Sequence, residues 1–422
     1  MNICKRYKCD TCYSLIDCRI GMSNREIQPF QFACPECKEK ITFTLGYDDL
    51  VGAIEIKDFK GPFTGDNHFV DLHLDFPVSF EKYKMGNTAF MRVVSAISQD
   101  SYNHLFDRLE LLNKLNNQHR NLRRLISQYK RGNIKTFENV INDLADLKFV
   151  KLNSHKKEDV ISALYSMTSI ISSPLTIHEH NVELSEKMPK FLMMLYNHHN
   201  ENSKVFFETI IENSFLKTVH HDCISLYPRL IKLELPLRPA LYYDYIDEEF
   251  GKVPARVSTA NFEMCNNTYK DLAEVFSRQL VLVAGLNNIF HRGDFNLFSD
   301  EVRLSKKNHN VIKEFSCLDD YANVDLGKKL LAIDNSFFEF NEDALDNKLR
   351  NSIAHFKYEY DEVSQIITYY SAKEGLERNK SIEISFMSFL RKILLLFRDV
   401  HSINHIIKAI FYHCIFILKK EV

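Results

Sequence analysis

The sequence predicts a mainly α-helical protein of several domains with a small metal-binding region at its N-terminus. Three observations support this: paired cysteines crowd the first residues, helical apolar spacing dominates after residue 80, and no proline follows Pro254. With 422 residues, 45% of them hydrophobic and 26% charged, the chain can form substantial cores. Shifts in composition divide it into segments 1–42, 43–80, 81–260 and 261–422.

Segment 1–42 predicts a zinc ribbon, because it contains two CxxC pairs. Two residues between cysteines let both sulfurs point inward from one tight turn, and two such turns supply the four thiolates that zinc favours. Four sulfurs complete a tetrahedron and leave no position for a catalytic water, so we expect a structural zinc. The expected ligands are Cys9, Cys12, Cys34 and Cys37. Cys4 and Cys18 are alternatives, each either a replacement ligand or a free thiol.

The next two segments differ in periodicity. Segment 43–80 is rich in glycine and proline and alternates apolar residues at Val70, Leu72 and Leu74, which predicts a small β-rich segment. Segment 81–260 has helical spacing, and its prolines predict breaks between helices. It includes a basic run without acids, RNLRRLISQYKRGNIK at 120–135, which fits either an RNA-backbone contact or a solvated helix face.

Segment 261–422 predicts a bundle of four or five helices, since long helices tolerate a stretch with few turn residues better than a sheet does. We expect the helices at Tyr269–Phe290, Asp325–Phe338, from near Glu342 onward, and Ile384–Arg398. The third contains the stretch LRNSIAHF at 349–356, in which an apolar stripe of Leu345, Leu349, Ile353 and Phe356 anchors the helix in a core.

The polar side of this stretch combines Arg350, Asn351 and His355. Asn351 and His355 are four residues apart and share a helix face, and the long side chain of Arg350 can curl toward Asn351. Positions five apart are about 140° apart on an ideal helix, so Arg350 and His355 converge only at a helix end or across a two-fold axis. Two other Arg–His pairs at similar spacing, Arg303–His309 and Arg398–His405, fit a charged surface loop and a satisfied or exposed helix histidine.

LRNSIAHF resembles the RNxxxH form of the motif of HEPN ribonucleases, and the proline-free C-terminus is similar to the helical bundle of that superfamily. The resemblance covers roughly residues 261–422. It implies a HEPN-like bundle that works as a homodimer and cuts RNA without a catalytic metal, with Arg350 and His355 as the catalytic pair and Asn351 in support. Many such proteins act in toxin–antitoxin or anti-phage systems, so a phage trigger or an antitoxin is an implied partner.

In an alternative interpretation, the C-terminal segment forms the same helical bundle but has no catalytic activity. In it, the bundle dimerises or binds nucleotides or RNA, and the zinc ribbon supplies the interaction surface.

The sequence has no glycine-rich phosphate loop, so we expect no bound nucleotide cofactor. The start MNICKRYKCD lacks an apolar core and no stretch is long enough to span a bilayer, so we expect a cytoplasmic protein without a membrane partner. A net charge of −2 permits a local basic groove but not a basic coat.

Overall fold

The computed structural model describes residues 1–46, 50–144, 150–176, 178–246, 255–259, 261–307, 310–313, 315–370 and 381–421. The chain forms two compact units, each built from segments far apart in sequence. Unit 1 contains Met1–Asn117, Lys232–Asn267 and Lys348–Leu394, and unit 2 contains Gln118–Ile231, Thr268–Asn347 and Leu395–Val422. Composition suggested four consecutive segments instead. Helices α10 (Phe262–Arg292), α14 (Asn347–Ala354) and α15 (Phe386–Phe416) begin in one unit and end in the other.

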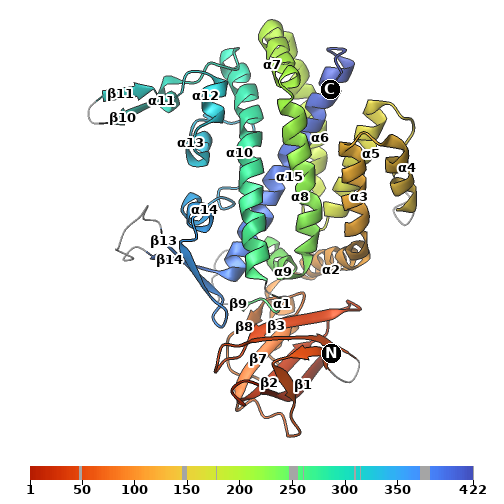
Figure 1. Ribbon diagram of the computed structural model, residues 1–422, viewed down its shortest axis with the longest axis vertical. Coiled ribbons are helices and arrows are strands. Elements are labelled where there is room, and N and C mark those ends of the chain that lie inside the picture. The colour runs from red at the N-terminus through yellow and green to blue at the C-terminus, as the bar shows by residue number, and fades with distance from the viewer. Residues whose placement is uncertain are drawn as a thin grey trace. The chain divides into compact units, whose positions relative to one another are not determined.

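Unit 1 carries the N-terminal strands, shown in red and orange in Figure 1. One sheet has the order β6-β1-β2-β7 and a second has the order β3-β4-β5. The strands are β1 (Asn2–Cys9), β2 (Leu15–Gly21), β3 (Gln28–Ala33), β4 (Lys40–Leu45), β5 (Leu50–Ile54), β6 (Ile56–Asp58) and β7 (His68–His73). A short pair, β8 (Val78–Ser79) and β9 (Ala255–Arg256), joins two segments of the unit.

The two sheets share one core. Tyr7, Ile16, Phe30, Ile41 and Val70 are fully or almost fully buried together, one from each of five strands. β2 is the central strand, antiparallel to β1 and parallel to β7. Because β6 and β7 pair with β1 and β2, the ribbon and the β-rich segment that follows it fold as one module.

Buried polar contacts connect the three segments of unit 1. The guanidinium of Arg238, which is fully buried, donates from Nε to Asp75 Oδ1 over 2.7 Å. The Gln365 side chain donates to the Val257 carbonyl at 2.9 Å and accepts from the Val257 N–H at 2.8 Å. Leaving such groups unpaired costs about 1–3 kcal/mol each, so these contacts fix which segments meet. The unit also contains α1 (Ala89–Ala96), α2 (Gln99–Leu115), α9 (Glu234–Leu237) and a 3-10 helix at Pro239–Asp244.

A three-stranded antiparallel sheet follows α14 in unit 1, and it corrects the expectation of an all-helical C-terminal segment. Its strands are β12 (Tyr358–Asp361), β13 (Ile366–Tyr370) and β14 (Ser381–Ser385), in that order. Ile366, Ile367 and Thr368 are consecutive β-branched residues, which favour a strand over a helix. For this segment, β-branched side chains therefore predict secondary structure better than the absence of proline does.

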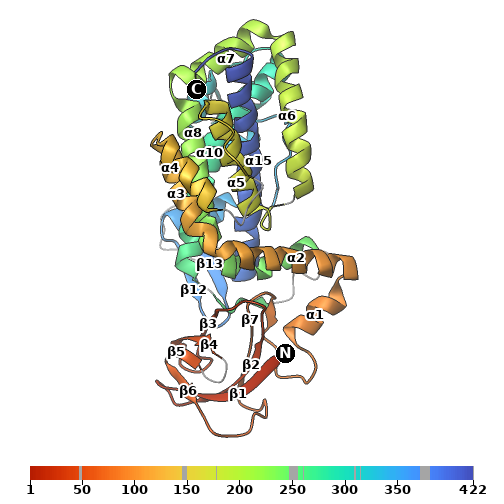
Figure 2. The same ribbon diagram turned by 90° about the vertical axis from the view of Figure 1, so that its right-hand side faces the viewer.

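Unit 2 is helical over most of its described residues. Its helices are α3 (His119–Lys130), α4 (Ile134–Asp143), α5 (Lys157–Ser172), α6 (His178–His198), α7 (Asn200–Glu212), α8 (Phe215–Lys232), α11 (Asp300–Arg303), α12 (Leu318–Ala322) and α13 (Leu326–Leu331). A hairpin of β10 (Leu304–Lys307) and β11 (Asn310–Lys313) lies between α11 and α12. Figures 1 and 2 both show α8 beside the unit 2 parts of α10 and α15, and the Gln279 side chain on α10 donates to the Val400 carbonyl on α15 at 3.0 Å.

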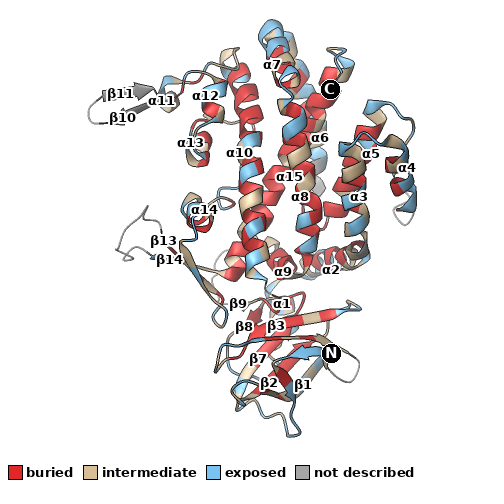
Figure 3. Ribbon diagram, viewed as in Figure 1, coloured by how far each residue is buried: buried red, intermediate tan, exposed pale blue. Residues whose placement is uncertain are grey.

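The core of unit 2 contains a buried polar network, and α15 is buried along most of its length there (Figure 3). The Tyr227 hydroxyl bonds His401 Nδ1 at 2.6 Å, and His401 Nε2 bonds His405 Nε2 at 3.2 Å. Asn404 Nδ2 donates to the same tyrosine, and Ser185 Oγ bonds His405 Nδ1. Burial lowers the pKa of His405 to about 4 and lowers that of His401 as well, so both rings are neutral near pH 7.

The structure confirms the mainly helical class but shifts several predicted helices. The helix expected over Asp325–Phe338 is reduced to α13, which ends at Leu331. Beyond it the chain is not helical: Asn335 takes a positive φ of 44°, and Asn287 Nδ2 donates to the Asp334 carbonyl at 2.8 Å. The prolines at 189 and 228 lie inside α6 and α8 instead of separating helices. Among the described residues, no helix combines the length and apolarity needed to cross a membrane.

Candidate metal centre and the Arg350–His355 site

The first CxxC pair lies on a tight turn where β1 ends. The Cys9 N–H donates to the Ser14 carbonyl at 3.0 Å, and the Tyr13 N–H donates to the Cys9 carbonyl at 3.1 Å. Tyr13 adopts a positive φ of 63°, a conformation that glycine takes most easily. These bonds close the turn and point the sulfurs of Cys9 and Cys12 the same way.

The second pair repeats this geometry between β3 and β4. The Cys34 N–H donates to the Glu39 carbonyl at 2.8 Å, and the Lys38 N–H donates to the Cys34 carbonyl at 2.9 Å. Lys38 has a φ of 65°, matching the residue at the same position of the first turn. Two turns with the same backbone geometry therefore face each other, as a tetrahedral metal site requires.

The four sulfurs meet the dimensions of such a site. All four lie within 4.8 Å of one another. Cys9 Sγ is 3.8 Å from Cys37 Sγ, and Cys12 Sγ is 3.7 Å from Cys34 Sγ. Two sulfurs of a regular tetrahedron are about 3.8 Å apart when each metal–sulfur bond is about 2.3 Å. The cluster is thus able to hold one metal ion through four thiolates.

The structure shows whether Cys4 or Cys18 belongs to the cluster. The Ser14 hydroxyl bonds the Cys12 sulfur at 3.1 Å and lowers the pKa of Cys12 to about 6, whereas burial raises the pKa of Cys9 and, together with the neighbouring cysteines, that of Cys37, so the thiolate is favoured on Cys12. Cys18 is fully buried in β2 and burial raises the pKa of its thiol, whereas Cys4 is exposed on β1. Neither belongs to the cluster of four.

The stretch at 349–356 forms the end of a short helix. α14 has eight residues and ends at Ala354, and His355 continues its last turn by donating its N–H to the Asn351 carbonyl at 3.1 Å. The Lys357 N–H donates to the Ser352 carbonyl at 2.8 Å and the Phe356 N–H to the Ile353 carbonyl at 3.3 Å. This pair of bonds is the Schellman motif, with His355 as the C-cap.

The polar residues of the stretch lie at the surface of unit 1. Asn351 and His355 are exposed, and Arg350 is half-buried. Arg350 Nη1 donates to Asn351 Oδ1 at 3.1 Å, so the arginine curls toward the asparagine as expected. The structure brings these two side chains into contact and places His355 on the cap that follows.

Phe356 does not belong to the expected apolar stripe. Leu349 and Ile353 are buried, but Phe356 is 81% exposed, because the helix has ended and the residue takes a positive φ of 56°. Glycine is the usual residue at this C′ position, and a bulky residue there is a conformational outlier. Such strain is concentrated at functional sites, so the exposed ring beside His355 is a further candidate residue. A helix-ending signal in the sequence would have been needed to find it.

Ser352 anchors the helix to the sheet that follows. It is buried, and its hydroxyl contacts two carbonyl oxygens, that of Lys348 at 2.8 Å and that of Tyr370 at 2.9 Å. The Tyr370 N–H in turn donates to the Lys357 carbonyl at 3.0 Å. The end of α14 is therefore held by β13 and has little freedom to unwind.

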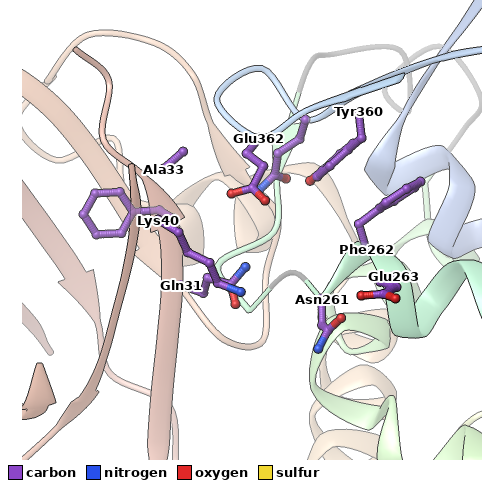
Figure 4. Close-up of a pocket in the computed structure, with 10 residues that line it drawn as sticks. Gln31, Ala33, Lys40, Asn261, Phe262, Glu263, Tyr360 and Glu362 are labelled. Atoms are coloured by element: carbon purple, nitrogen blue, oxygen red, sulfur yellow. The ribbon is translucent and has the colours of Figure 1, made fainter. Parts of the chain in front are cut away.

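A cavity of about 180 Å³ lies in unit 1 where β3 and β4, the start of α10 and the β12–β13 hairpin come together. Figure 4 shows Lys40 and Gln31 on one side and Tyr360, Phe262 and Glu362 on the other. The rings of Phe262 and Tyr360 stack with centroids 4.3 Å apart. The cavity lies between the two strands that flank the second CxxC turn and the hairpin that begins after His355, and it has lining groups of both charges.

The other Arg–His pairs are placed differently. Arg398 is buried and its Nε donates to the Leu175 carbonyl at 3.0 Å, while His405 belongs to the buried network of unit 2. This pair has the satisfied helix histidine that we expected. For the pair Arg303–His309, His309 and the Arg303 side chain lie outside the described residues.

Comparison with protein-family models, with curated proteins and with solved structures finds no match.

Proposed function

We propose that this protein is a metal-independent endoribonuclease of the HEPN type, with Arg350, Asn351 and His355 as its site. The observation that carries the proposal is the end of α14, where a Schellman cap presents an exposed histidine and an adjacent Arg–Asn pair. Side chains able to transfer a proton and to bind a phosphate occupy one anchored, accessible helix end. The resemblance of RNSIAH to the HEPN motif supports the same function.

The chemistry follows from these residue types. His355 takes the proton of the ribose 2′-OH, and the 2′-oxygen attacks the adjacent phosphorus. The bond from phosphorus to the 5′-oxygen breaks, and the protonated His355 gives its proton to the leaving oxygen, which becomes a 5′-OH. The other product ends in a 2′,3′-cyclic phosphate. Arg350 binds the phosphate and stabilises its extra negative charge, and Asn351 orients the guanidinium. RNA supplies its own nucleophile, so no metal-bound water takes part.

The site acts as part of a homodimer in this proposal. Arg350 lies within α14 and bonds Asn351, whereas His355 is the C-cap five positions later, about 140° further round on an ideal helix, so we propose that the two groups meet across a two-fold axis. A two-fold axis beside the end of α14 places the histidine of each subunit near the arginine of its partner. Oligomeric state and activity should therefore change together on dilution.

The cysteine cluster holds a structural Zn²⁺ in this proposal. Four thiolates at tetrahedral spacing are the ligand set that zinc prefers, and no coordination position is left for a substrate. The ion stabilises the module of β1 to β4. Lys38 of the second turn also pairs with Asp361 of the β12–β13 hairpin at 3.0 Å, although both side chains are largely exposed and the pair is worth little.

The biological role that fits is an effector of anti-phage defence or a toxin, acting on RNA in the cytoplasm. Its activity is then controlled by a trigger or an antitoxin. An effector of this kind stops growth when it is active and unrestrained, so toxicity to an expressing cell is the expected consequence.

Purified wild type and variants test the proposal on single-stranded RNA and on DNA of the same sequence. Wild type should cut RNA with EDTA present, provided that the structural zinc is retained, and should spare DNA, which lacks the 2′-OH. Arg350→Ala and His355→Ala should abolish cutting, whereas Asn351→Ala should weaken it less. Arg229→Ala on α8 is the arginine control: it is exposed, lies outside the basic run at 120–135 and should cut normally. Products without 2′,3′-cyclic ends would contradict the mechanism.

A further inference from the structure

Unit 2 has a cavity that the proposed ribonuclease site does not use. Its volume is about 210 Å³, and it is lined by residues of α3, α4, α5, α8 and α15. Figure 2 shows α3, α4 and α5 packed together in yellow and orange. Most of the wall is apolar or aromatic, as in Phe137, Val160, Ile161 and Phe411. All of the lining residues belong to unit 2, so the cavity is complete within it.

His220 is the unusual residue of this wall. It is fully buried, and neither Nδ1 nor Nε2 has a hydrogen-bond partner among the described residues. Tyr165 stacks on its ring at 5.5 Å, and Phe411 meets the ring edge-on at 5.0 Å. Burial lowers the pKa of His220 to about 3, so the ring is neutral near pH 7 and offers one N–H donor and one nitrogen acceptor. Buried polar atoms are normally paired, so these two atoms point to a ligand.

The rim of the cavity is positively charged. Lys130, Lys157 and Lys217 line it and are exposed, and the lining contains no carboxylate. The charge affects the neighbouring imidazole: burial is the main cause that lowers the pKa of His221, and Lys130 and Lys217 lower it further. Lys130 is held in place by Ser225 Oγ at 3.0 Å. An anionic group therefore fits at the rim.

The size of the cavity limits the ligand. A dry cavity of about 150 Å³ accommodates a benzene ring. A volume of about 210 Å³ thus has room for one flat ring and little more. We propose that this cavity binds a single-ring heteroaromatic anion of the pyrimidine mononucleotide class, with the ring against His220 and the phosphate at the lysine rim.

This site is independent of the Arg350–His355 chemistry and is tested without measuring RNA cleavage. Full-length protein is titrated with uridine 5′-monophosphate, with uridine, with adenosine 5′-monophosphate and with inorganic phosphate, and binding is followed by calorimetry. Uridine lacks the anionic group, phosphate lacks the ring, and the adenine ring system is larger. Uridine 5′-monophosphate should bind saturably and at least about tenfold more tightly than each of the other three, about 1.4 kcal/mol.

Two variants separate the ring contact from the charge. His220→Phe keeps an aromatic ring but removes both nitrogens, so the affinity for uridine 5′-monophosphate should fall about tenfold. Lys217→Met keeps the apolar stem and removes the charge, so the same affinity should fall while weak uridine binding stays unchanged. Lys190→Met, at an exposed position of α6 outside the cavity, is the matched control and should bind like wild type.

Three results would overturn the proposal. The first is no saturable binding of uridine 5′-monophosphate at low millimolar concentration. The second is inorganic phosphate binding as tightly as the nucleotide, which would reduce the site to a cluster of lysines. The third is wild-type affinity in Lys217→Met, a change at the surface that should not disturb folding. If His220→Phe does not fold, Lys217→Met still decides between these outcomes.

Discussion

At the residue scale, Phe356 combines an exposed aromatic ring with a strained backbone conformation. A phenylalanine that is 81% exposed and has a φ of 56° is costly where glycine would be relaxed, and it directly follows His355. In the proposed ribonuclease, this ring stacks on a base of single-stranded RNA. Such stacking is worth about 1–3 kcal/mol per base.

The variant Phe356→Gly separates backbone strain from RNA contact. We expect its free energy of unfolding to stay within about 1 kcal/mol of wild type, because glycine relieves the strain but adds freedom to the unfolded chain. The KM for RNA should rise by about tenfold, since a lost stacking contact weakens binding. Phe356→Tyr should retain most of the affinity. Unchanged KM in the glycine variant would show that the ring does not contact RNA.

The cysteine cluster gives a second prediction at this scale. Purified wild type should contain one zinc per chain, and Cys9→Ser should lose most of it, because a hydroxyl is a far poorer zinc ligand than a thiolate. Cys4→Ser changes an exposed cysteine outside the cluster and is the matched control. Metal analysis by mass spectrometry measures both. Equal zinc in the two variants would contradict the assignment of the ligands.

The sequence predicted residues well where spacing determines geometry. The CxxC spacing placed all four sulfurs correctly, because a turn of this length has few conformations. Spacing gives no such information for His220, which is polar in sequence but fully buried in the structure. Burial depends on which helices pack around a residue, and the local sequence does not encode that. The next residue, His221, is a histidine as well but remains partly exposed.

At the scale of elements, apolar periodicity predicted neither the end of α14 nor the sheet that follows it. Apolar spacing correctly predicted a helix through Leu349 and Ile353, but it did not show that the helix ends at Ala354. The cap there uses Phe356 in place of glycine, so the usual stop signal is absent. The three strands that follow were missed because a proline-free stretch was interpreted as helical.

The buried histidines of α8 and α15 make the helical unit sensitive to acid. The pKa of His405 is about 4 in the folded state and about 6.5 when unfolded. Below pH 6.5 the unfolded chain therefore binds a proton at this residue that the folded chain does not. The stability is fully present above pH 6.5 and is lost as the pH falls toward 4, by up to about 3 kcal/mol from this group.

Denaturation across this pH range measures the effect. Wild type should lose stability steeply between about pH 6.5 and 4, and His405→Gln should show a shallower slope because glutamine does not titrate. His198→Gln, at an exposed position of α6, is the control and should keep the wild-type slope. A slope in His405→Gln as steep as that of wild type would show that the ring is already protonated in the folded protein.

At the scale of the whole molecule, the four cysteines proposed as metal ligands all belong to unit 1. Removing the metal with a strong chelator should therefore speed amide hydrogen exchange in β1 to β4, which the two metal turns hold together. The amides of α8 in unit 2 should keep their protection, because that unit has its own core. Hydrogen exchange with mass spectrometry resolves these segments. Loss of protection in α8 as well would mean that the two units unfold as one.

The division of the chain into two units was the feature that the sequence predicted least well. Composition placed boundaries along the chain, but each unit is built from three segments that are separated in sequence by segments of the other unit. Contacts such as Arg238 with Asp75 decide this arrangement. Both residues are charged and would be expected at the surface, so their pairing in the interior left no signal in hydrophobic patterns.

The central claim is that His355 transfers a proton during RNA cleavage. The most direct measurement expresses wild type, His355→Ala and His198→Ala at matched levels in a bacterial host and follows the integrity of total RNA. Wild type and the control, His198→Ala, should degrade RNA and stop growth to the same extent. His355→Ala should leave RNA intact, because general acid–base catalysis contributes about 10²–10⁴-fold to rate. Equal RNA decay from wild type and His355→Ala would contradict the account.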